Sequence, residues 1–143
     1  MIILIIVLFA AQLHAMSGVC THVGAGWDNR RGASGIRYDH RLPMAAHRTL
    51  KFGTVVKVVN ADRRSSNYGK SVRVIIVDRG PVKKSRCLDA MPFPLWQLAG
   101  KRVGGLRVKL EVASTKCACE GYRCLSKKLG TSHMTMKIFE ECN

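Results

Sequence analysis

Two strand-like runs in the middle of the chain constrain the fold more than any other part of the sequence. Residues 55–59 are rich in valine, and residues 72–77 are rich in valine and isoleucine. Glycine, asparagine or proline stands beside each run, which is typical of strands that end in turns. The second run stops at Asp78, because the Gly80-Pro81 pair that follows interrupts strand pairing. This stretch predicts a β-rich core with a carboxylate at the end of a strand.

The length of 143 residues favours one domain. A third strand is predicted at residues 104–112, where apolar residues alternate with charged ones. Residues 21–32 are rich in glycine and predict a loop, and residues 32–39 predict a turn and a short strand. The basic segment 61–70 predicts a longer loop between two strands. Strands joined by irregular loops are therefore expected to make up most of the domain.

Two short helical segments are predicted between the strands. Residues 43–50 follow a proline and include two alanines, which favours a helical turn. A second helix is predicted after Asp89, which is well placed as its N-cap. We expect Pro92 in the first turn of this helix and Pro94 at a kink. The order of short helix, glycine turn and strand then occurs twice, which indicates a faint internal duplication.

The first residues predict export from the cell. Residues 2–9 are apolar throughout but too few to span a bilayer, which takes roughly 20 residues. They suit a signal peptide of residues 1–15 that is cut after Ala15, and a retained membrane anchor is the alternative. Val19 precedes Cys20, where a lipoprotein cleavage site requires a smaller residue. We therefore predict a secreted or periplasmic protein that is not a lipoprotein.

Six cysteines accompany this signal-like start, and an even number favours disulfides in an oxidising compartment. The candidates are Cys20, Cys87, Cys117, Cys119, Cys124 and Cys142. They allow 15 pairings, among which a link from Cys20 to the C-terminal tail would tie both ends to the core. A zinc site in the tail is the rival interpretation, but the paired Cys-x2-Cys spacing is missing. We expect disulfides and no metal.

The net charge of +15 favours polyanionic partners. All lysines and arginines lie at or after Arg30. Nucleic acid, anionic lipid and acidic cell-wall polymers would all be attracted by this charge. Aromatic residues are few and no nucleic-acid-binding motif is present, so we expect no nucleic-acid partner.

A series of short motifs occurs in one order along more than half of the chain. They are Ala33-Ser34-Gly35, Arg37-Tyr38-Asp39, Ala45-Ala46-His47-Arg48-Thr49-Leu50, Phe52-Gly53-Thr54, Asp78-Arg79-Gly80-Pro81 and Leu88-Asp89. This series resembles the rare lipoprotein A (RlpA) family of lytic transglycosylases. The resemblance implies an all-β fold, a six-stranded double-psi β-barrel with short helices, over residues 33–112. An N-terminal loop (16–32) would precede the barrel, and a cysteine-rich basic tail (113–143) would follow it.

The resemblance also implies an activity and a site. Members cleave the bond between N-acetylmuramic acid and N-acetylglucosamine in peptidoglycan and leave 1,6-anhydro ends, without a cofactor. Asp78 would be the catalytic acid and base, and His47 a second functional residue. The residues assigned to substrate binding are Tyr38, Asp39, Arg48 and Arg79. As purely structural alternatives, Asp78 would cap a strand end and His47 would be a packed core residue.

One position departs from the family. Ile36 stands where the family carries a glutamate, and an isoleucine cannot transfer a proton. Either Asp39 replaces this glutamate, or the protein is a non-catalytic, expansin-like barrel that binds the cell wall. If Asp89 reached the site beside Asp78, two-carboxylate hydrolysis would be a further option. In each case we expect a monomer whose partners are peptidoglycan glycan strands, with anionic wall polymers as additional candidates.

Overall fold

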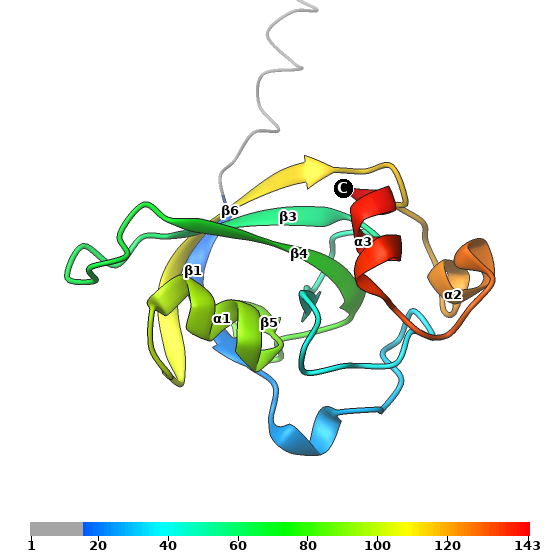
Figure 1. Cartoon of the computed structure of the whole chain (residues 1–143), viewed down its shortest axis with the longest axis horizontal. Coiled ribbons are helices and arrows are strands. Elements are labelled where there is room, and N and C mark those ends of the chain that lie inside the picture. Colours follow the sequence, from blue (N-terminus) through cyan, green and yellow to red (C-terminus); the bar gives the residue numbers. More distant parts are fainter. Residues whose placement is uncertain (1–15) are drawn as a thin grey trace, which may run out of the picture.

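Six strands form a closed barrel in the computed structural model, which describes residues 16–143. The strands follow one another around the barrel in the order β1-β5-β2-β4-β3-β6. Figure 1 shows the barrel with α1 and the tail helices beside it. Their bounds are Met16–His22 (β1), Met44–Ala46 (β2), Val55–Asn60 (β3), Ser71–Asp78 (β4), Arg86–Ala90 (β5) and Gly105–Ser114 (β6). The predicted all-β fold, a six-stranded barrel with short helices, is confirmed. The predicted signal peptide, residues 1–15, lies outside the described residues.

The core is built mainly from the strands that the sequence predicts. Strands β3 and β4 pair antiparallel, with Val55 opposite Ile75, and β3 also pairs with β6. The side chains of Val55, Ile75 and Ile76 are fully buried. Burying a side chain of this size contributes roughly 1.5–3 kcal/mol. The three predicted strands are therefore confirmed, and their β-branched residues stabilise the barrel.

Strand β1 lies in a segment that was predicted to be a loop. Residues Met16–His22 pair parallel with β5 and antiparallel with β6, so they close the barrel. The barrel thus begins at Met16 and not at residue 33, and the predicted loop of residues 16–32 is wrong as far as His22. The segment has little strand character of its own, because glycine and serine stand in its first half. Its two neighbouring strands supply the pairing.

Strand β2 replaces the predicted helical turn at residues 43–50. Residues Met44–Ala46 lie between β4, with which they run parallel, and β5, with which they run antiparallel. Each of the three side chains is at most 3% exposed. Strand pairing on both sides therefore outweighs the helix propensity of the alanines. The predicted duplication loses its first helix.

Helix α1 (Pro92–Ala99) lies where the second helix was predicted, but it begins differently. Asp89 belongs to β5 and does not cap the helix; Met91 occupies the N-cap position without a side-chain hydrogen bond. Pro92 and Pro94 are the first and third residues of the helix. Backbone N–H groups in the first turn have no partner within the helix, so proline is tolerated there. The predicted cap at Asp89 is therefore wrong, while Pro92 lies in the first turn as predicted, and Pro94 lies in that turn as well.

The C-terminal tail packs on the barrel as two short helices, α2 (Cys124–Leu129) and α3 (Met136–Cys142) (Figure 1). Disulfides join Cys117 to Cys142 and Cys119 to Cys124. Cys20 and Cys87 are buried free thiols, so their prediction as disulfide partners is wrong, and the possible link from Cys20 to the tail is not formed. The zinc interpretation also fails, because all four tail cysteines are in disulfides. Within residues 16–143, no helix combines the length and the apolar character needed to cross a bilayer.

The predicted loops follow the expectation in part. Residues 61–70 form turns between β3 and β4, as predicted. Residues 32–39 were predicted to include a short strand, but they make only isolated bridges. Arg37 bridges to Arg31 on one side and to His133 of the tail on the other. This segment therefore links the start of the barrel to the tail.

Candidate active site at the ends of β2, β4 and β5

A row of four residues crosses four neighbouring strands where β4 ends. Thr21 of β1 is in register with Asp89 of β5, Asp89 with Ala46 of β2, and Ala46 with Asp78 of β4. Register partners project their side chains from the same face of a sheet. The two carboxylates therefore stand on one face, on either side of the small Ala46. Two strand spacings of about 4.8 Å separate their backbones.

Asp78 is held by two hydrogen-bond donors. The backbone N–H of Ala33 donates to Oδ1 at 2.7 Å, and the hydroxyl of Tyr38 donates to Oδ2 at 3.0 Å. Gly32 allows this approach, because a Cβ at that position would lie 2.6 Å from the carbonyl oxygen of Val77. The side chain is only partly buried. The carboxylate is therefore fixed in orientation but still reachable from outside.

Tyr38 is a buried donor to this carboxylate. Its side chain is 2% exposed. Burial raises the pKa of the Tyr38 phenol, and the charges of Asp78 and Asp89 raise it further. The phenol therefore remains protonated and can always donate to Asp78.

His47 follows β2 and lies beside Asp78 through its backbone. Its N–H donates to the carbonyl oxygen of Asp78 at 3.2 Å. The ring nitrogen Nδ1 accepts from the backbone N–H groups of Thr49 (3.1 Å) and Leu50 (3.0 Å), which leaves the proton on Nε2. Burial and the charges of Arg48 and Arg79 lower the pKa of His47 to about 4. His47 is therefore neutral at pH 7 and organises the turn at residues 47–50.

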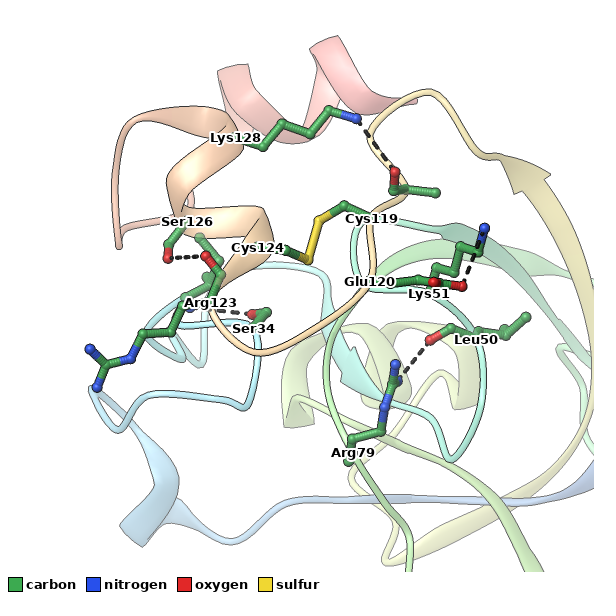
Figure 2. Close-up of a disulfide and its surroundings, with 12 residues drawn as sticks. Ser34, Leu50, Lys51, Arg79, Cys119, Glu120, Arg123, Cys124, Ser126 and Lys128 are labelled. Atoms are coloured by element: carbon green, nitrogen blue, oxygen red, sulfur yellow. Dashed lines mark hydrogen bonds and ion pairs between the residues drawn. A yellow bond between two sulfur atoms is a disulfide. The ribbon is translucent and has the colours of Figure 1, made fainter.

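Arg48 and Arg79, both predicted to bind substrate, brace backbone segments around the site. Nη1 of Arg79 donates to the carbonyl oxygens of Leu50 (2.7 Å) and His47 (3.1 Å), and its guanidinium lies 4.0 Å from the centre of the Phe52 ring. Figure 2 shows the bond from Arg79 to Leu50. Arg48 donates to the carbonyl oxygen of Arg86 at 2.7 Å and to that of Pro81 at 3.2 Å. Both side chains therefore hold the backbone around the site, and Arg79 is bonded to the turn that contains His47.

Neither Ile36 nor Asp39 supplies a carboxylate beside Asp78. The Ile36 side chain is fully buried in the core. Asp39 is engaged by Arg41, which donates to both carboxylate oxygens at 3.0 and 2.8 Å. The side-chain hydrogen bond from Arg41 is the main reason that the pKa of Asp39 is lowered. Asp39 is therefore held by Arg41, and among the described residues no hydrogen bond joins its side chain to Asp78.

Thr21 and Asp89 form a second polar pair in the same row. The Thr21 hydroxyl donates to Oδ1 of Asp89. Sequence reasoning assigned Asp89 to a helix cap and passed over Thr21, which it placed in a loop. The short run of Val19, Cys20 and Thr21 is the one strand signal in that segment, and it is weak. Strand register thus brings Asp89 into the same row as Asp78.

Two further features lie beyond the row. A cavity of about 740 Å³ is lined by Asp28, His40 and Arg41 on one side and by Pro92, Phe93 and Trp96 of α1 on the other. Asp28, Asp39 and His40 present potential metal-ligand atoms within 4.8 Å of one another. These atoms already have partners, because His40 binds Asp28 at 3.0 Å and Arg41 binds Asp39. The cavity, in contrast, is open and largely apolar.

A family profile and individual relatives assign the chain to the same family. The family profile described as "Lytic transglycolase" matches residues 21–110. The "Probable endolytic peptidoglycan transglycosylase RlpA" of Treponema pallidum is 36% identical over 107 residues, which cover 74% of this chain and 32% of the relative. The protein of the same name from Synechocystis is 44% identical over 72 residues, covering 50% and 21%. The chain thus spans about a fifth to a third of the length of these relatives.

A solved structure supports the barrel type. The apo expansin of Clavibacter michiganensis superposes with a TM-score of 0.51 and 16% sequence identity, covering 69% of this chain and 50% of that one. A mutant of the same expansin, solved in complex with cellohexaose, gives a TM-score of 0.50. At this identity the likeness concerns the fold alone. It agrees with the double-psi barrel that the sequence motifs imply.

Proposed function

Since the chain belongs to the lytic transglycosylase family of RlpA-like double-psi β-barrels, we propose that it is a secreted enzyme that acts on peptidoglycan. It cleaves the β-1,4 bond between N-acetylmuramic acid and N-acetylglucosamine and leaves 1,6-anhydro ends. The main support is the partly exposed Asp78, whose two oxygens are oriented by Ala33 and Tyr38. The names of the relatives agree with this substrate.

Asp78 acts first as an acid and then as a base. Its carboxyl group gives a proton to the bridging oxygen while the bond from that oxygen to C1 of the muramic acid breaks. The 6-hydroxyl of the same sugar then attacks C1, and its proton returns to Asp78. No water is consumed, and the acid form is regenerated. The donors on Asp78 hold the carboxyl group in one orientation through both steps.

Asp89 assists from the other side of Ala46. The bond breaks through a transition state with positive charge at C1. A carboxylate on the same face of the sheet stabilises such charge, and Thr21 fixes its orientation. His47 contributes by shaping the turn against which Asp78 and Arg79 lie. Ile36 takes no part in the chemistry.

The glycan strand extends from this row toward α1. Phe93 is 54% exposed and lies with Trp96 on one side of the cavity of about 740 Å³. Aromatic rings of this kind suit the apolar faces of sugars, while Asp28 and His40 across the cavity offer polar partners. The strand would thus lie over the ends of β5 and β4, with the scissile bond above Ala46.

A digest of purified sacculi tests the chemistry. The mature protein is compared with Asp78→Asn, Asp89→Asn and the matched control Asp62→Asn, which lies on the distant loop between β3 and β4. Products are identified by mass spectrometry. We expect anhydro-muropeptides from the unmodified protein and from Asp62→Asn, and a loss of roughly 10²–10⁴-fold for Asp78→Asn. A smaller loss is expected for Asp89→Asn.

Other outcomes separate the alternatives. Reducing ends in place of anhydro ends would mean that water attacks C1 and that the enzyme is a hydrolase. Sedimentation with sacculi without any product would instead support the non-catalytic, expansin-like barrel. The burial of Ile36 at the family's glutamate position is the observation that favours this second candidate. Equal activity of Asp78→Asn and the control would remove Asp78 from the mechanism.

A further inference from the structure

A small loop of the tail, closed by the disulfide between Cys119 and Cys124, lies directly against the barrel (Figure 2). We call residues 119–124 the disulfide loop. It lies outside residues 21–110, which match the family profile. The N–H of Cys119 donates to the carbonyl oxygen of Phe52 at 2.8 Å, and Glu120 forms an ion pair with Lys51 at 3.5 Å. The loop is therefore attached to the segment that precedes β3.

The disulfide loop also reaches the candidate acid. The N–H of Arg123 donates to the carbonyl oxygen of Ala33 at 3.1 Å, and the N–H of the same Ala33 donates to Asp78. One residue thus links the tail to the acid. On the other side of Asp78, Arg79 lies over Phe52, the residue to which Cys119 is bonded. The loop consequently flanks the site at two points.

Close packing keeps this arrangement tight. A Cβ at Gly53 would collide with the carbonyl group of Cys117, and a Cβ at Gly35 would lie 2.5 Å from Oγ of Ser126. Both glycines have positive φ angles of 86°, which other residues rarely adopt. At Gly35 and Gly53 the tail therefore approaches the barrel more closely than a residue with a Cβ would permit. The disulfide loop is a fixed wall of the site and is held on both flanks.

Tyr122 stands at the tip of this fixed wall and is 84% exposed. With Phe52, Arg79 and Gly121 it lines a cavity of about 250 Å³. That volume lies below the roughly 300–1,000 Å³ of pockets for drug-sized ligands, so it suits one ring-sized group. Phe52 is only 3% exposed, so the accessible surfaces are the Tyr122 ring and the edge of Arg79. The backbone of the loop fixes the position of Tyr122, and its exposed ring lines the same cavity as the guanidinium of Arg79.

We propose that the disulfide loop forms a glycan subsite of its own, in which one N-acetylhexosamine ring stacks on Tyr122 and accepts a hydrogen bond from Arg79. Only Nη1 of Arg79 is engaged by described residues, so Nε and Nη2 remain to donate to a sugar oxygen. The subsite rests on the proposed function, because the sugar belongs to the glycan strand. Its position next to Asp78 would hold the strand on the side opposite α1.

Binding without turnover tests the subsite. The parent carries Asp78→Asn, and its affinity for peptide-free glycan strands prepared from sacculi is measured by calorimetry. Tyr122→Ala is compared with Tyr122→Phe and with Tyr68→Ala, an equally simple change at a 53% exposed tyrosine on the loop between β3 and β4. We expect Tyr122→Ala to weaken binding by roughly three- to tenfold. Tyr122→Phe and Tyr68→Ala should bind like the parent.

The results also distinguish the subsite from the chemistry. Unchanged affinity of Tyr122→Ala, equal losses in Tyr122→Ala and Tyr68→Ala, or a parent that binds no glycan would each overturn the subsite. Binding that depends on Tyr122, in a protein that yields no anhydro products from sacculi, would uphold the subsite and reject the transglycosylase. Circular dichroism and the mass of the oxidised protein verify that each variant is folded with both disulfides.

Discussion

Ile36 limits which residues can carry acid–base chemistry at the candidate site. The resembled family carries a glutamate at this position, yet the side chain here is fully buried and only its backbone is polar. The N–H of Ile36 donates to Oγ of Ser34 at 3.2 Å, which helps to shape the segment around Asp78. In the proposed mechanism the acid–base chemistry therefore rests on Asp78, with Asp89 on the same face.

His47 makes the stability of the fold depend on pH. Its pKa is about 4 in the folded chain against 6.5 ordinarily. The unfolded chain therefore binds a proton below about pH 6.5, which the folded chain does not until about pH 4. This contribution to stability is complete above pH 6.5 and is lost as the pH falls to 4, by about 3 kcal/mol in all.

His47→Asn should remove that dependence, because asparagine keeps an oxygen that accepts from Thr49 and Leu50 but does not titrate. Urea unfolding at pH 7.5 and pH 4.5 measures the effect. Between these two values we expect the unmodified protein to lose roughly 2–3 kcal/mol more than the variant. Equal losses in both proteins would mean that the pKa of His47 is the same in the folded and the unfolded chain.

The sequence motifs predicted the positions of some site residues but not the contacts between them. Asp78 follows a clear strand and precedes Gly80 and Pro81, so its place at a strand end could be read directly. Tyr38 was named as a site residue, but its bond to Asp78 spans 40 residues and depends on the folded loop. Asp89 was misassigned because an acid before a proline-rich helix resembles an N-cap. Its position in the row with Asp78 follows from strand register, which is a tertiary property.

At the scale of elements, strand pairing explains the strands that local sequence propensity did not predict. Strands β3, β4 and β6 carry long alternating or β-branched runs and were predicted. Strand β2 has only three residues, two of them alanine, and is a strand because β4 and β5 lie on either side of it. Strand β1 is likewise defined by its neighbours. Both were missed for the same physical reason.

The two disulfides of the tail should differ in their effect on stability. Cys117–Cys142 spans 25 residues and Cys119–Cys124 spans 5. Chain entropy assigns about 3.5 kcal/mol to the longer link and about 2 kcal/mol to the shorter one. Urea unfolding of the two double alanine variants should therefore show a greater loss for the pair at 117 and 142. A greater loss for the pair at 119 and 124 would contradict this expectation.

For the whole molecule, the charge of +15 should govern attachment to an anionic cell wall. The screening length falls from roughly 10 Å at 0.1 M salt to roughly 3 Å at 1 M. Sedimentation of the Asp78→Asn protein with sacculi should therefore decline between 0.05 and 1 M NaCl, by roughly tenfold in affinity. Uncharged chitin is the control and should show little change. Retention at high salt equal to that at low salt would assign attachment to sugar contacts alone.

Strand β1 also determines the order in which the chain can fold. It pairs Met16 with Leu110 and Val19 with Arg86, so its partners lie far along the sequence. Contacts between distant residues form slowly, and the barrel cannot close until β6 has left the ribosome. The nascent chain consequently stays open through most of its synthesis. A chain must be unfolded to pass through a membrane pore. For a protein proposed to be secreted, the late closure of the barrel therefore keeps the chain unfolded until translation is nearly complete.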